Sequence, residues 1–97
     1  MDLGNLMKQA QKMQKDMAKV EKLLAETEYS GEAQAVKCTI NGNMELVKMD
    51  IEDDALEDKE MLIDMITIAF NSASKKAQAD RDAKLGGITG GMRIPGM

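Results

Sequence analysis

An apolar seam at heptad spacing runs through the first 25 residues and constrains the fold more than any other feature. Its members are separated alternately by three and four residues: Leu3, Leu6, Ala10, Met13, Met17, Val20 and Leu24. This is the a/d pattern, which places all seven on one side of an α-helix. We therefore predict a helix from Asp2 to Thr27, whose apolar side the rest of the chain has to cover.

Lysines lie on the opposite side of this predicted helix. With Leu3 assigned to heptad position a, they fall at positions c and f, which share a surface remote from the seam. They are Lys8, Lys12, Lys15, Lys19 and Lys22. The pattern is compatible with a binding surface and equally with an ordinary solvated surface, so it does not assign a function by itself.

The composition predicts a single small domain. The 97 residues contain no internal linker, so we assign residues 1–85 to the domain and 86–97 to a flexible glycine-rich tail. The net charge of −4 is uneven: +2 in residues 1–25, −9 in 26–64 and +3 in 65–97. With a single cysteine and no apolar run of transmembrane length, we expect a soluble, cytosolic protein.

The middle of the chain changes to an alternating pattern. Apolar and polar residues alternate over residues 35–51, with Asn41-Gly42-Asn43 as a hairpin signal. A turn centred on Gly42-Asn43 would place Cys38 opposite Val47 and join the two apolar faces. A shorter strand over residues 28–33 is more weakly indicated.

A second helix follows the hairpin. Asp58 is a suitable N-cap, and Glu60 suits the positive end of the helix dipole. Apolar residues recur at helical spacing from Met61 to Ala77, and Gly86-Gly87 is expected to end the helix.

The lengths of these elements predict a homodimer. The first helix is about 37 Å long at 1.5 Å per residue. A sheet of two or three strands is only about 10–15 Å across. Such a sheet cannot cover both helices, and a second copy of the chain is the simplest cover for the remaining apolar surface.

Catalytic and metal-binding patterns are weak. The chain has no histidine. Ser72 and Lys75 have the spacing of an acyl-serine motif, but its companion motifs are missing. Residues 50–61 partly match a calcium loop, but Ala55 and Met61 replace the required Gly and Glu. The ten methionines lie mostly on apolar seams, as core filler. We predict no enzymatic activity, no cofactor and no metal site.

Several short stretches together resemble the YbaB/EbfC family of bacterial nucleoid-associated proteins. They occur in the family's order along nearly the whole chain: LMKQAQKMQ (6–14), DKEML (58–62), AFNSASKKA (69–77), GGITGGM (86–92) and PGM (95–97). The resemblance implies an α+β subunit with a long N-terminal helix, an antiparallel three-stranded sheet and a long C-terminal helix. It also implies a tweezer-like homodimer that binds double-stranded DNA in the bacterial nucleoid.

The candidate DNA site comes from charge geometry, because the resemblance supplies no motif for single contact residues. It consists of Lys8, Lys12, Lys15, Lys19, Lys75, Lys76, Arg81 and Lys84, which would neutralise phosphates. Tyr29 and Phe70 are the only aromatic residues, which argues against a base-stacking platform. The alternative is a protein-interaction module that docks a replication or recombination protein and reaches DNA only indirectly. Neither hypothesis involves a membrane.

Overall fold

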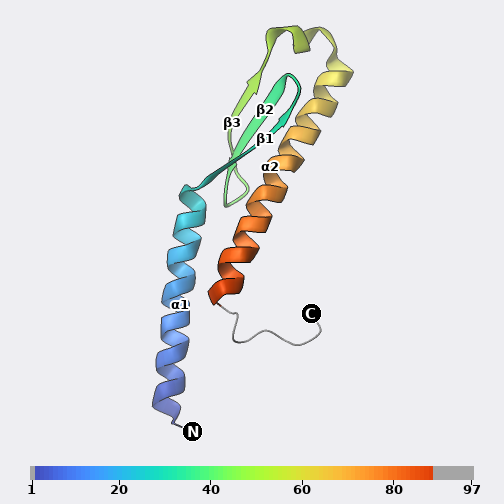
Figure 1. The fold of residues 1–97 in the computed structure, drawn as a ribbon. Helices are drawn as coiled ribbons and strands as arrows, with labels where there is room; N and C mark the ends of the chain where they lie inside the picture. Colours follow the sequence, from blue (N-terminus) through green and yellow to red (C-terminus); the bar gives the residue numbers. More distant parts are fainter. Residues whose placement is uncertain (1, 89–97) are drawn as a thin grey trace, which may run out of the picture.

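The computed structural model describes residues 2–88, which form two long helices and one small sheet (Figure 1). The order is α1 (Leu3–Glu26), β1 (Glu28–Ala33), β2 (Val36–Asn41), β3 (Leu46–Ile51), a short 3-10 helix η1 (Asp53–Glu57) and α2 (Lys59–Ile88). The strands form one antiparallel sheet in the order β1-β2-β3. The predicted α+β architecture is confirmed, including the weakly indicated first strand.

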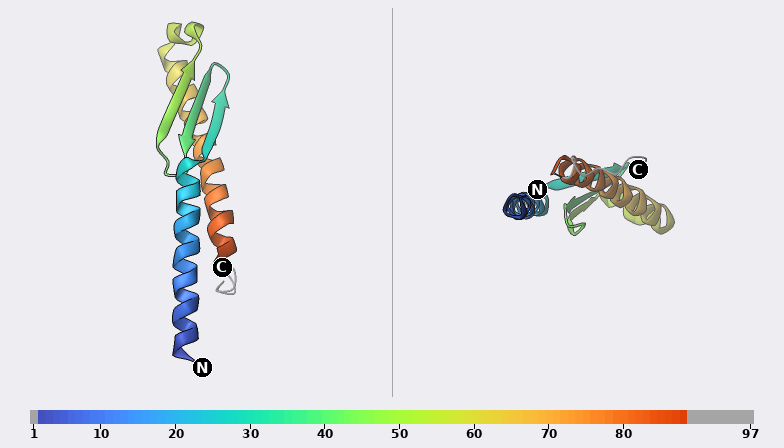
Figure 2. Two further views of the ribbon diagram at one scale, coloured as in Figure 1. Left: turned by 90° about the vertical axis from the view of Figure 1, so that its left-hand side faces the viewer. Right: turned by 90° about the horizontal axis from the view of Figure 1, so that it is seen from below.

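Helix α1 has the predicted limits. The Asp2 carboxylate caps it by accepting a 3.0 Å hydrogen bond from the Gly4 N–H, and Thr27 is its C-cap. The rest of the chain leaves much of its apolar seam exposed, as the comparison of element lengths predicts. Leu24 is fully buried, whereas Leu3, Leu6 and Met17 remain 75%, 43% and 36% exposed. The reason is geometric, because α1 runs past the end of the sheet and projects away from it (Figures 1 and 2).

The hairpin is present, but its predicted register is wrong. Cys38 lies opposite Met49 rather than Val47, and the pairing shifts between Thr39 and Ile40, leaving Val47 at a bulge. The connecting loop is longer than a two-residue turn. The Asn41 side chain organises it by accepting hydrogen bonds from the N–H groups of residues 43 and 45.

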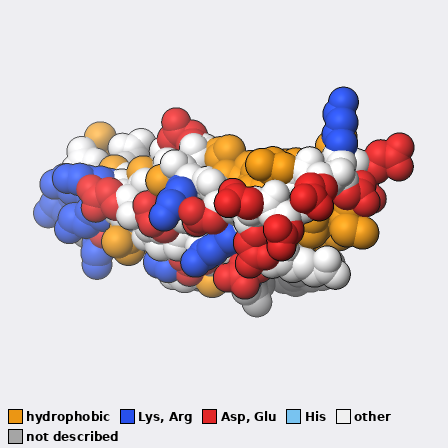
Figure 3. Space-filling view, turned by 90° about the horizontal axis from the view of Figure 1, so that it is seen from above, with side chains coloured by type: hydrophobic (Ala, Val, Ile, Leu, Met, Phe, Trp, Pro, Cys, Tyr) orange, Lys and Arg blue, Asp and Glu red, His pale blue; other side chains and the backbone are white. Residues whose placement is uncertain are grey.

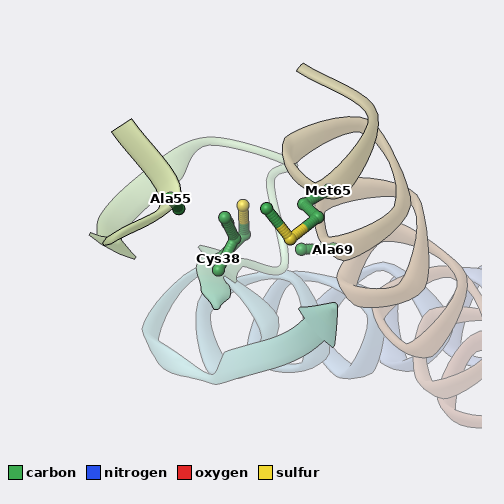
Figure 4. Close-up of a cluster of buried hydrophobic side chains, with 5 residues drawn as sticks. Cys38, Ala55, Met65 and Ala69 are labelled. Carbon is green, nitrogen blue, oxygen red and sulfur yellow. The ribbon is translucent and has the colours of Figure 1, made fainter. Parts of the chain in front are cut away.

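The core lies between α2 and the first two strands. Met65, Ala69, Ala73 and Ala77 recur every four residues along α2 and are buried against apolar side chains such as Cys38. Figure 4 shows Cys38, Ala55, Met65 and Ala69 meeting in one of the two buried clusters.

Small residues let α2 approach β1 very closely. A Cβ atom added at Gly31 would lie 2.1 Å from the Ala69 carbonyl oxygen and 2.5 Å from the Ala73 nitrogen. Only glycine fits this position without moving the helix, so the contact between strand and helix depends on Gly31.

The second helix begins as predicted and ends later. The Asp58 carboxylate accepts a 3.1 Å hydrogen bond from the Met61 N–H, which confirms the N-cap. The predicted stop at Gly86-Gly87 is wrong, because α2 continues to Ile88. Glycine lowers helix propensity by only about 1 kcal/mol and does not exclude the conformation. Residues 89–97, the remainder of the predicted tail, lie outside the described residues.

The described chain is long and thin. Its extents are 67 × 29 × 13 Å, and α1 lies antiparallel beside the C-terminal part of α2 (Figure 2). The end bearing η1 and the start of α2 lies far from the N-terminus of α1 (Figure 1). Within residues 2–88 no helix is both long and apolar enough to cross a membrane.

Candidate functional site

The lysines of α1 form an exposed surface, hereafter the lysine face. All five predicted positions are exposed: Lys8, Lys12, Lys15, Lys19 and Lys22. In the part of the chain that the structure describes, none of them forms an ion pair with a carboxylate within 4 Å. Their ammonium groups are therefore available to an external anion.

The predicted cations of α2 have different surroundings. Lys75 is exposed, like the lysines of α1. Lys76 Nζ donates a 2.6 Å hydrogen bond to the Ser30 carbonyl oxygen of β1. Lys84 forms an ion pair with Asp80, one helical turn earlier. Lys76 and Lys84 therefore already have internal partners, a backbone carbonyl group and a carboxylate.

Asp80 also accepts a hydrogen bond from the hydroxyl of Tyr29, whose ring lies in the core. Burial, and then the hydrogen bond and charge of Asp80, raise the pKa of Tyr29 from 10.0 to about 12. The hydrogen bonds from Lys84 and Tyr29 hold the pKa of the Asp80 carboxyl below its usual value. This network ties β1 to α2 and leaves Asp80 ionised at neutral pH.

Arg81 is the most constrained of the predicted site residues. One guanidinium nitrogen donates to both carboxylate oxygens of Glu21, at 2.8 and 3.0 Å. Another donates to the Gly42 carbonyl oxygen at 3.3 Å. The side chains of Arg81 and Glu21 are 28% and 42% exposed. Arg81 therefore links α2 to α1 and to the loop between β2 and β3.

The charges are separated along the molecule. Residues 52–64, which include η1 and the start of α2, contain seven acidic residues and one lysine. Figure 3 looks down onto this end, where acidic side chains are spread among exposed hydrophobic ones while the basic side chains gather mainly at one side. The molecule is therefore an electric dipole, with its negative end remote from the free end of α1.

The other chemical candidates do not assemble into a site. Cys38 is fully buried, and burial raises the pKa of its thiol. Among the described residues, no group of three or more His, Cys, Asp and Glu side chains could hold a metal ion.

The internal partners of the α2 cations were not predicted from the sequence. The Asp80–Lys84 pair has i,i+4 spacing, so its signal was present. Glu21 and Arg81 are 60 residues apart, and no local pattern relates them. Ser30 offers only its backbone carbonyl, which any residue could supply.

The chain is similar in sequence to one protein family and in fold to a solved structure. The YbaB/EbfC DNA-binding family matches residues 1–92 of the chain. A similar fold occurs in the crystal structure of the uncharacterized protein HP0035 from Helicobacter pylori, with a TM-score of 0.78 and 28% sequence identity. That match covers 86% of this chain and 91% of the other.

Proposed function

Since the chain belongs to the YbaB/EbfC DNA-binding family, we propose that it binds duplex DNA as a nucleoid-associated homodimer, through the lysine face of α1. The observation that carries this assignment is the set of exposed α1 lysines without ion-pair partners among residues 2–88. Binding to the chromosome would place the protein in the nucleoid of the bacterial cytoplasm.

The binding mode we infer is electrostatic. Lysine ammonium groups along one helix face match a row of phosphates and release counterions, which gives affinity with little sequence readout. Stacking on bases is not part of the mechanism, because Tyr29 is buried and Phe70 packs against the core.

The charge dipole of the molecule also favours contact between DNA and α1. The acidic residues of 52–64 repel a polyanion, while the lysine face attracts it. Long-range attraction and repulsion together favour an approach in which DNA meets α1 and the acidic end points away.

The homodimer follows from the uncovered seam. Leu3, Leu6 and Met17 are exposed along α1 on the side opposite the lysines. A second copy that covers this seam buries apolar surface and leaves the lysines in solvent. Light scattering at micromolar concentration should give the dimer mass. A monomer mass with the fold intact would exclude this arrangement.

The proposed DNA surface is tested by changing Lys8, Lys12, Lys15 and Lys19 together to Gln. Glutamine is a comparable helix former, so the fold should persist. Affinity for unrelated duplexes should fall to a similar extent. The log–log salt slope should flatten by up to about 0.9 for each lost phosphate contact. Unchanged affinity and slope would show that the lysine face is only solvated surface.

The acidic end supports a second candidate function. Leu56, Met61 and Ile63 are more than half exposed among its carboxylates. Exposed apolar groups surrounded by one sign of charge are typical of a protein-docking surface. If the wild-type protein fails to bind duplex DNA at low salt, a docking role for this end, with a replication or recombination protein as partner, replaces direct DNA binding.

A further inference from the structure

We propose that Arg81 and Glu21 form a positioning pair that sets the direction of α1, and that Arg81 is not a phosphate contact. The inference rests on the proposed function, because the direction of α1 determines where the lysine face lies. It differs from the expectation from charge alone, which grouped Arg81 with the phosphate-binding residues.

The first observation is the small size of the junction between α1 and the body. Leu24 is the only fully buried residue of α1. Its carbonyl oxygen accepts a 2.8 Å hydrogen bond from the Gly42 N–H in the loop between β2 and β3. A Cβ atom on Gly42 would lie 2.2 Å from that oxygen, so the helix end and the loop are in direct backbone contact.

The second observation is that Arg81 bridges both sides of this junction. Its guanidinium holds Glu21, one turn before Leu24, and also the carbonyl group of Gly42. The chain connection through Thr27 and one hydrogen bond beside it leave the direction of the helix adjustable. A second attachment one turn away, made by a planar group whose other nitrogen holds the Gly42 carbonyl, restricts that change of direction.

The third observation is electrostatic. An arginine whose donors are directed to a carboxylate 2.8 Å away carries little unbalanced charge toward DNA. A phosphate could recruit this guanidinium only by displacing Glu21 and loosening the junction. Arg81 therefore acts on DNA binding through α1, in contrast to the unpaired lysines of that helix.

Neutralising Glu21 separates the two roles, because they predict opposite results. Glu21→Gln removes a negative charge from the lysine-bearing helix. If Arg81 were a phosphate contact, this change would free it and tighten DNA binding. If the pair positions α1, binding should weaken by about fivefold or more, the lower range of typical couplings between separate sites. Arg81→Lys keeps the charge but has a single nitrogen, so it cannot hold Glu21 and the Gly42 carbonyl through two separate donors, and it should weaken binding similarly.

Glu26→Gln is the matched control. Glu26 lies on the same helix, is exposed, and has no ion-pair partner among the described residues. Glu26→Gln removes the same charge without removing a bond of Arg81, so binding should stay equal or become slightly tighter. If Glu21→Gln binds as tightly as Glu26→Gln and Arg81→Lys binds as wild type, the positioning role is excluded.

A measurement without DNA tests the junction directly. Spin labels at Gln11→Cys on α1 and Asn71→Cys on α2 would report the distance between the helices. Mixing labelled protein with excess unlabelled protein limits each dimer to one labelled chain. Cys38 is fully buried, so it should not take up the label.

The wild-type distance distribution should be narrow, and Glu21→Gln and Arg81→Lys should shift or broaden it. Unchanged distributions would overturn the proposal whatever the DNA result. If the wild-type protein binds no DNA but these distributions broaden, the proposed function fails and the positioning pair stands. Circular dichroism of both variants verifies that the helices remain formed.

Discussion

Helix α1 and the C-terminal half of α2 both carry several basic residues, but they use them differently. The lysines of α1 are exposed and have no carboxylate partner among residues 2–88. In α2, Lys76, Arg81 and Lys84 all contact groups of the chain itself. Their partners lie on four different segments: Ser30 in β1 for Lys76, Asp80 one turn earlier in α2 for Lys84, and Glu21 in α1 together with the β2–β3 loop for Arg81. The lysines of α1 lie on a helix that projects past the sheet (Figure 2). Packing, more than residue type, decides which cations remain free.

The largest effect is expected where α2 packs most closely. Gly31→Ala should destabilise the protein by about 1–3 kcal/mol, because the added methyl group collides with the backbone of α2. The melting temperature should fall by roughly 5–20 °C at equal protein concentration. Gly87→Ala is the matched control, since nothing lies within 4 Å of a Cβ at Gly87. Equal melting temperatures for the two variants would show that the helix and strand are not in close contact.

The hydrogen bond between Tyr29 and Asp80 should have a smaller effect. Tyr29→Phe removes the hydroxyl but keeps the buried ring, so the loss should be about 1 kcal/mol. Chemical denaturation with an unchanged m-value would measure it. DNA affinity should not change in the folded protein, because the hydrogen bonds of Tyr29, Asp80 and Lys84 join β1 to α2 and do not involve the lysine face. A parallel loss of affinity would contradict the division between the two helices.

A pH titration of Tyr29 can test its hydrogen bond to Asp80. Tyr29 is the only tyrosine, and the chain has no tryptophan, so phenolate absorbance reports it alone. The midpoint should lie near pH 12 in the folded protein and near 10 in denaturant.

Because the folded state binds this proton more tightly, its stabilising contribution is complete below pH ~10 and is lost as the pH rises to ~12. Asp80→Asn should lower the folded midpoint, since it removes the charge that opposes ionisation of the phenol. An unchanged midpoint in that variant would leave burial as the sole cause of the shift.

The smallest effect on DNA binding is expected for Lys76 and Lys84 of α2. Changing Lys76 and Lys84 together to Gln should leave the salt slope close to that of wild type, because both side chains contact the chain itself. Gel shifts at several salt concentrations would measure the slope. A flattening comparable to that of the α1 quadruple variant would extend the DNA surface onto α2.

The elements of the fold were predictable because their signals are local. The a/d seam defined α1, the Asp58 cap defined the start of α2, and alternation defined the hairpin. The register was not predictable, because it depends on the bulge at Val47 and on the loop that Asn41 organises. The exposed part of the α1 seam was predictable from lengths, because a sheet about 10–15 Å across cannot cover a helix about 37 Å long.

The candidate site divides in the same way. The lysine face follows from helical spacing alone, and the structure places those lysines where the spacing indicates. Arg81 could not be separated from them by sequence, because its partner Glu21 is 60 residues away. Whether a basic side chain is paired depends on the tertiary structure, whereas a single sequence shows only which residues are near it along the chain.

Because α1 is anchored at its C-terminal end near Leu24, a change in its direction displaces its residues in proportion to their distance from Leu24. Lys19 is about 8 Å from Leu24 along the helix axis and Lys8 is about 24 Å away, at 1.5 Å per residue. A tilt of ~10° at the junction therefore moves the backbone at Lys8 by about 4 Å but at Lys19 by only about 1 Å. Along one strand of duplex DNA the phosphates follow one another at roughly 3.4 Å of the axis. A small angular error should consequently shift Lys8 by about one phosphate while Lys19 keeps its contact, so loosening the junction should weaken contacts most at the N-terminal end of α1.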